Sequence, residues 1–252
     1  MTSLAFTVLG AGTAKAHADR GPAGFVVSHG GRRFLIDGGS GTLQRLARAG
    51  VDPQQLAGGV YSHRHVDHTG DLVPLLFSFC VPPKRQAPYP VWAGAGFGAF
   101  LASLQGVYGR WSTPPGGVAV TELPLDGPGQ ADLGLGLELH TRPANHSAGA
   151  LHLRFDAGGR SVVFSGDTGP SDALAELSHN VDLLVVECAG SDEAPIPGHL
   201  TPSTVAELLA AARPTQAWVT HLYPHVDRER ALATIRTAGV AAQLAADGDR
   251  WG

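Results

Sequence analysis

YSHRHVDHTGD, residues 61–71, places three histidines and two aspartates within eleven positions. A packed core tolerates so many polar side chains only if each one has a partner. Imidazole nitrogens and carboxylate oxygens are ligands that suit zinc, manganese or iron. His63 and His65 are two residues apart, so both can reach one cation if the chain is locally extended, and Asp67 and His68 can then reach a second. The stretch therefore predicts one part of a metal site.

Other residues of the same chemical type stand where apolar runs end. His63 follows GVYS, Asp167 follows VVFSG and His221 follows AWVT, while His146 lies in RPANHSAGA between two predicted strands. In α/β proteins, sites form where the ends of strands converge on one edge of a sheet. We therefore expect these distant segments to complete the site that begins at residues 61–71.

The pattern of apolar residues predicts mixed sheets with helices outside them. Residues 4–10 read as a first strand, and Phe25–Ser28 and Arg33–Asp37 read as a hairpin that turns at Gly30-Gly31. In the later half, strands alternate with helices, as in VDLLVVECAG, TPSTVAELLAAA, QAWVTH and DRERALATIRTAG. Because no linker interrupts this order, we expect a single domain over residues 1–252.

The composition excludes several classes of protein. The chain has 252 residues, of which 43% are hydrophobic and 16% charged, as is usual for a soluble globular protein. Its net charge of −4 weighs against a dedicated nucleic-acid binder. Cys80 and Cys188 are predicted to be buried thiols in a reducing compartment. Neither a secretory signal nor a membrane-spanning apolar run is present, so we expect a cytoplasmic protein that does not bind membranes.

Four motifs resemble, in the same order, those of the metallo-β-lactamase superfamily: HRHVDH at 63–68, NHS at 145–147, SGDT at 165–168 and THLYP at 220–224. The resemblance implies an α/β fold, a four-layer αββα sandwich of two mixed β-sheets flanked by helices. It also implies two divalent metal ions, with zinc as the first choice and manganese or iron as alternatives. By this resemblance one metal would take His63, His65 and His146, the other would take Asp67, His68 and His221, and Asp167 would bridge them.

Asp37 and the remaining histidines have two readings. Asp37 is either a turn aspartate before Gly-Gly or a carboxylate that orients a ligand histidine, and the resemblance favours the second reading. The histidines outside the four motifs and outside GHLTP are expected to be surface or packing residues. They are His17, His29, His140, His152, His179 and His225.

GHLTP, residues 198–202, resembles the His-x-Thr motif of the ribonuclease Z and phosphodiesterase branch, and Glu187 matches an acidic residue upstream of it. In that branch the histidine, here His199, is thought to assist the phosphoryl transition state or the leaving group. In ribonuclease Z, the chain between the positions of His146 and Asp167 contains a long protruding arm, and this arm binds transfer RNA. Here one predicted hairpin, SAGALHLRFDAGGRSVVFSG, joins these residues, which together with the negative net charge argues against transfer RNA as a substrate.

The resemblance implies a dinuclear metal-dependent phosphodiesterase that acts on a small or cyclic phosphodiester through a water bridging the two metals. Asp67 would orient or deprotonate the nucleophile, and His199 would protonate the leaving oxygen or bind the phosphoryl group. A lactonase or other ester hydrolase, a ribonuclease Z-like nuclease and a metal-dependent binding or redox protein are the alternatives. The expected partner is a small-molecule phosphodiester, and a homodimer remains open.

Overall fold

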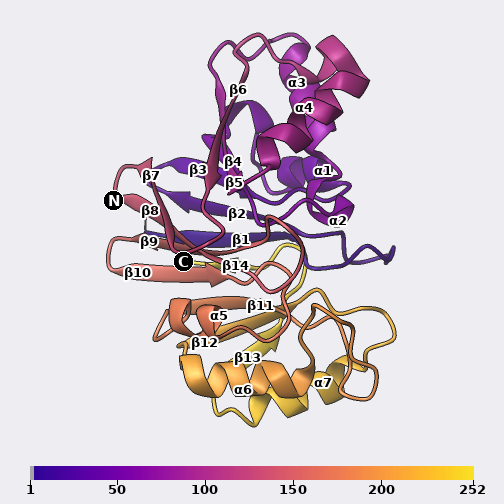
Figure 1. Cartoon of the computed structure of the whole chain (residues 1–252), viewed down its shortest axis with the longest axis vertical. Coiled ribbons are helices and arrows are strands. Elements are labelled where there is room, and N and C mark those ends of the chain that lie inside the picture. Colours follow the sequence, from indigo (N-terminus) through magenta and orange to yellow (C-terminus); the bar gives the residue numbers. More distant parts are fainter. Residues whose placement is uncertain (1–2) are drawn as a thin grey trace.

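Two mixed seven-stranded sheets form the centre of the computed structural model, which describes residues 3–252 (Figure 1). The first sheet has antiparallel pairs from β14 through β3 and parallel pairs from β3 through β6. In sheet order its strands are β14 (Arg250–Trp251), β1 (Ala5–Gly10), β2 (Gly24–His29), β3 (Arg32–Ile36), β4 (Gly58–Tyr61), β5 (Tyr89–Gly94) and β6 (Val118–Leu123).

The second sheet repeats this plan, with antiparallel pairs from β7 through β10 and parallel pairs from β10 through β13. In sheet order its strands are β13 (Ala241–Leu244), β12 (Gln216–Thr220), β11 (Leu183–Glu187), β10 (Arg160–Phe164), β9 (Leu151–Ala157), β8 (Leu137–Pro143) and β7 (Gly129–Gly134).

Helices cover the outer face of each sheet, so that Figure 1 shows α1, α3 and α4 on one side of the strands and α5, α6 and α7 on the other. The helices beside the first sheet are α1 (Thr42–Arg48), α2 (Val66–Thr69), α3 (Leu72–Cys80) and α4 (Phe97–Tyr108), with the short 3₁₀ helices η1 (Pro53–Gln55) and η2 (Gly109–Ser112). Those beside the second sheet are α5 (Asp172–Leu177), α6 (Pro202–Ala212) and α7 (Arg228–Arg236).

The alternation of side chains along the strands produces the layers. On β2, Phe25 and Val27 point into the core between the sheets, whereas Val26 points outward toward the helices. The ring of Phe25 lies 4.7 Å from that of Phe164 on the other sheet, so the two inner faces are in direct contact. Because central strands such as β2 carry apolar residues on both faces, both faces must be covered, and the predicted αββα sandwich is confirmed.

Residues with strong turn or capping preferences lie where the sequence predicts turns and helix starts. The β2–β3 hairpin turns at Gly30 and Gly31 with φ values of 58° and 81°, as predicted. Thr201 is the N-cap of α6, and the Thr204 hydroxyl accepts a hydrogen bond from its backbone N–H at 2.8 Å. The sequence did not predict β7, β13, β14, α2 and α5, which are short and only weakly patterned.

The cysteines only partly match the expectation. Both Cys80 and Cys188 are free, but Cys188 is buried and Cys80 is partly exposed at the end of α3. The prediction of two buried thiols is therefore wrong for Cys80, whose position in the last turn of a surface helix leaves it open to solvent. None of the helices in residues 3–252 is long and apolar enough to cross a membrane.

Candidate metal centre

The ligand-type residues of both halves meet at the edge where parallel strands of the two sheets end. His63 follows β4, Asp167 follows β10 and His221 follows β12. His221 has φ of 59°, a conformation that costs energy for a residue other than glycine. Its backbone N–H donates to the Ala11 carbonyl at 3.1 Å, which ties the end of β12 to the loop after β1.

One group of ligand atoms comes from the predicted first metal set. His63, His65, His146 and Asp167 each place one nitrogen or oxygen within 4.8 Å of the others. Nε2 of His146 lies 3.1 Å from Nδ1 of His65, and Nε2 of His63 lies 3.7 Å from Oδ2 of Asp167. On the other side of its ring, Nδ1 of His146 donates to the Gly198 carbonyl at 2.8 Å, so Nε2 is left with its lone pair toward the group.

A second group comes from the predicted second metal set. Asp67, His68 and His221 also place ligand atoms within 4.8 Å of one another. Nε2 of His68 and Nε2 of His221 each lie 3.3 Å from Oδ2 of Asp167. The same carboxylate therefore faces both groups, in the position that a bridging ligand would need.

The donors fit a metal cation for a specific reason. Nε2 of His63, His68 and His221 are buried and have no hydrogen-bond partner among the described residues. An orphaned buried polar atom costs free energy, yet three of them converge on one carboxylate. Burial lowers the pKa of His63 and of His221, which favours the neutral imidazole that binds metals. The residues thus form His/Asp clusters consistent with a metal site.

The chain between His63 and His68 is only partly extended. His65 has an extended backbone with ψ of 151° and serves as the N-cap of α2, where helical geometry begins. Asp67 and His68 therefore project from one helical turn. The expectation of a locally extended loop holds through His65, while the helical turn directs Asp67 and His68 to the second group.

Asp37 is the carboxylate that orients a ligand histidine, which is the interpretation that the family resemblance favoured. It is fully buried, and its Oδ2 accepts from Nδ1 of His68 at 2.7 Å and from the Ser62 hydroxyl at 2.7 Å. Its Oδ1 accepts from the Ser62 backbone N–H at 2.7 Å. Because the carboxylate accepts a hydrogen bond from Nδ1–H of His68, the proton stays on Nδ1 and the lone pair of Nε2 faces Asp167.

His199 and Glu187 form a further pair at the edge of the clusters. Nδ1 of His199 lies 2.7 Å from Oε1 of Glu187, and Glu187 also accepts the backbone N–H groups of Thr168 and Ala189. Burial opposes the charged form of His199, but the hydrogen bond and charge of Glu187 outweigh it and raise the pKa of His199. His199 also lies within 4.8 Å of ligand atoms of Asp167 and His221, although the sequence assigned it no metal.

Two residues with clear structural roles were missed from the sequence. The Ser62 hydroxyl lies between Asp37 and Nδ1 of His63, which is 3.1 Å away. Arg64 donates to the carbonyls of Gly96 and Ala148 and so fastens the metal motif to two other loops. A serine or an arginine beside a metal motif carries no signal of such contacts, because the partners are distant in sequence.

Comparisons with known proteins agree with the fold and identify the family. A family model described as "Beta-lactamase superfamily domain" matches residues 32–222. The ribonuclease Z of Mycobacterium bovis is 29% identical over 197 residues, which cover 72% of this chain and 69% of that protein. The chain therefore belongs to the metallo-β-lactamase superfamily, and the fold and clusters indicate a metal-dependent hydrolase.

Two solved structures share the fold. The metallo-β-lactamase fold protein YhfI from Bacillus subtilis superposes with a TM-score of 0.86 at 22% identity, and all of both chains is covered. A diphosphatase from the PhnP family superposes with a TM-score of 0.76 at 20% identity, with 98% of this chain and 96% of that one covered. Within the superfamily, the chain is thus related to ribonuclease Z and to PhnP-like phosphodiesterases.

Proposed function

We propose that this protein is a dinuclear metal-dependent phosphodiesterase that acts on a small or cyclic phosphodiester. The observation that carries the proposal is the His199–Glu187 pair, which lies next to residues of both ligand groups. The centroid of the His199 ring lies 4.9 Å from that of His146 and 5.9 Å from that of His221. A proton held at this position can be delivered beside whatever the metal clusters bind.

His63, His65 and His146 would hold one metal and Asp67, His68 and His221 the other, with Asp167 between them. Zinc is the first choice for these donors, and a related fold, PqqB from Methylobacterium extorquens, has been solved with Zn²⁺ bound. When bound, a metal pair supplies an activated water and neutralises charge on phosphoryl oxygens.

The protein's own groups would orient the substrate and move the protons. Oδ2 of Asp67 lies 4.0 Å from Nε2 of His68 and 3.8 Å from Nε2 of His221, so this carboxylate is placed to orient the attacking water and accept its proton. Nδ1 of His199 is occupied by Glu187, so Nε2 is the ring nitrogen that can protonate the leaving oxygen or bind the phosphoryl group.

The short segment between His146 and Asp167 favours a small substrate over transfer RNA. That segment consists mainly of β9 and β10, which pair through Arg160 and Ala157 across a turn at Gly158 and Gly159. A tight hairpin supplies no arm for transfer RNA. The relatives named ribonuclease Z make an RNA nuclease the second candidate, and the substrate tests below separate the two.

The test of the proposal is the variant His199→Ala, assayed on phosphodiesters with a poor and a good leaving group. A positioned acid contributes about 10²–10⁴-fold in rate, so kcat on an alkyl phosphodiester should fall by that amount. On bis-p-nitrophenyl phosphate the fall should be smaller, because nitrophenolate leaves without a proton. The matched control is His179→Ala, which removes an exposed histidine after α5 and should leave both rates unchanged.

Two results would contradict the role of His199. Equal losses on both leaving groups, with a lower melting temperature, would assign His199 to structure. An unchanged kcat on every phosphodiester, together with hydrolysis of lactones or other neutral esters, would replace the phosphodiesterase by an ester hydrolase of the same fold.

A further inference from the structure

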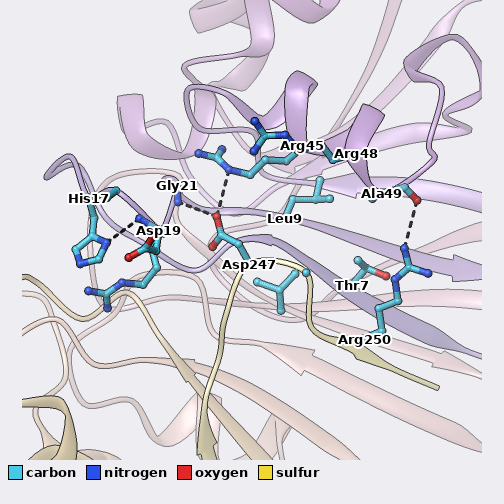
Figure 2. Close-up of a pocket in the computed structure, with 14 residues that line it drawn as sticks. Thr7, Leu9, His17, Asp19, Gly21, Arg45, Arg48, Ala49, Asp247 and Arg250 are labelled. Atoms are coloured by element: carbon cyan, nitrogen blue, oxygen red, sulfur yellow. Dashed lines mark hydrogen bonds and ion pairs between the residues drawn. The ribbon is translucent and has the colours of Figure 1, made fainter.

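A cavity of about 470 Å³ lies beside α1 and is lined by none of the residues of the two ligand groups (Figure 2). It is bounded by β1, the loop around residues 17–21, the end of α1 and the turn before β14. Positive charge predominates in its lining, since four arginines face two aspartates. These residues are Arg20, Arg45, Arg48 and Arg250 against Asp19 and Asp247.

Arg45 is held in place before any ligand arrives. Its Nε lies 3.2 Å from Oδ2 of Asp247, and its Nη1 donates to the Ser40 carbonyl at 3.3 Å. The guanidinium packs against Gly21 so closely that a Cβ there would lie 1.6 Å from Nη2. The side chain is therefore fixed by its surroundings and loses little further freedom on binding.

Among the described residues, the other three arginines of the cavity have no carboxylate partner of the kind that Asp247 provides for Arg45. Arg20, Arg48 and Arg250 form no ion pair with any residue of the described chain, 3–252, although all three line the same cavity. Arg250 makes one hydrogen bond, from Nη2 to the Ala49 carbonyl at 3.3 Å, and Figure 2 shows its side chain pointing toward Ala49. Like charges gathered around one concavity repel one another unless an anion lies between them.

We propose that this cavity binds a small molecule that carries a phosphate group. Guanidinium groups recognise phosphate through paired, charge-assisted hydrogen bonds, and the cavity has the size of a small-molecule site. The partly exposed Ala49 also lines it and can give apolar contact to the organic part of the ligand. The net charge of −4 on the whole chain favours a small phosphate ester over a nucleic acid.

The choice of variants follows from how the cavity is joined to the metal centre. Asp247 accepts the backbone N–H groups of Ala11 and Gly21, each at 2.9 Å, and the Ala11 carbonyl accepts from the His221 backbone. Replacing Asp247 or Arg45 would therefore disturb the loop that holds a candidate metal ligand. Arg48 and Arg250 are exposed and lie outside this network, so they can be replaced without that effect.

The experiment is calorimetric titration of the metal-loaded enzyme with adenosine monophosphate, inorganic phosphate and adenosine. The double variant Arg48→Gln/Arg250→Gln is compared with the wild type and with Arg33→Gln/Arg110→Gln, which removes the same charge from exposed sites elsewhere. Loss of charge-assisted hydrogen bonds should weaken binding of adenosine monophosphate at least about tenfold in the first variant only. The rate of bis-p-nitrophenyl phosphate hydrolysis should stay within about twofold of the wild-type rate in both variants. A loss of ligand affinity can therefore be told apart from a loss of the proposed activity.

Several outcomes would overturn the proposal. If adenosine monophosphate binds only at the metal clusters, its affinity for Arg48→Gln/Arg250→Gln will equal that for the wild type. Equal weakening in both variants would show only a general effect of charge. Adenosine binding as tightly as its monophosphate, or no binding of either phosphate at millimolar concentration, would each exclude a small phosphate ester in this cavity. Thermal melts and the single variant Arg48→Gln guard against misfolding.

Discussion

The exchange Asp37→Asn is expected to weaken one metal position while it leaves the fold intact. Asp37 is fully buried and accepts three hydrogen bonds, two from Ser62 and one from Nδ1 of His68, each at 2.7 Å. An asparagine has one oxygen and one NH₂ group in place of two oxygens. If its oxygen serves the Ser62 backbone N–H, its NH₂ group faces Nδ1 of His68.

In that arrangement His68 must move its proton from Nδ1 to Nε2, and a protonated Nε2 cannot bind a metal. If the amide turns the other way, its NH₂ group meets the buried N–H of Ser62, and a hydrogen bond is lost. Removing such a supporting carboxylate typically costs 10–100-fold in metal affinity, or about 1.4–2.7 kcal/mol. The loss should fall on the group that contains His68, with Asp67 and His221.

The assay is competition between the metal-loaded protein and a chromogenic chelator. The wild type should show two positions, and Asp37→Asn should show one of them weakened by about 10–100-fold. Asp71→Asn is the control, because Asp71 accepts from the Leu43 backbone N–H at 2.8 Å and is assigned no metal. Two positions of unchanged affinity in Asp37→Asn, at a normal melting temperature, would refute the argument from the tautomer of His68.

Three further predictions follow from the site and its surroundings. Protein purified without chelators should contain close to two metals per chain by elemental analysis, and a value near zero in protein that also takes up no added metal would exclude a dinuclear site. Precursor transfer RNA should be a poor substrate, so efficient cleavage at the 3′ end of the acceptor stem would contradict the small-substrate proposal. Burial lowers the pKa of His152 to about 4 against an ordinary value of 6.5, so the neutral ring stabilises the fold above pH 6.5. This stability, about 3 kcal/mol, should be lost as pH falls from about 6.5 to about 4. Chemical denaturation of His152→Gln should lack that part of the pH dependence, and parallel curves for the variant and the wild type would show that His152 does not titrate as stated.

For His152, the sequence pattern predicts the strand on which it lies but not its hydrogen-bond partners. It was expected to be a surface or packing residue, and it is buried, with Nδ1 2.7 Å from the Ser165 carbonyl and Nε2 3.1 Å from the Ser171 hydroxyl. A histidine that makes both of its hydrogen bonds within the protein has no lone pair left for a ligand. Its position on β9 follows from the alternating pattern, but its two partners follow only from the packing of neighbouring segments.

The sequence alone was sufficient to predict the layered fold and the residue types of the site. Consecutive apolar residues along β2 or β10 point to opposite faces of the sheet, so both faces must be covered, and the glycines at 30 and 31 specify the hairpin between β2 and β3. These features depend on near neighbours in the chain. Only the tertiary structure decided where the distant groups meet. It placed one oxygen of Asp167 between the imidazoles from two halves of the chain, joined His199 to Glu187, and brought Arg45 and Arg250 to one cavity. These contacts depend on strand order and on register across the sheets, and local spacing carries no information about either.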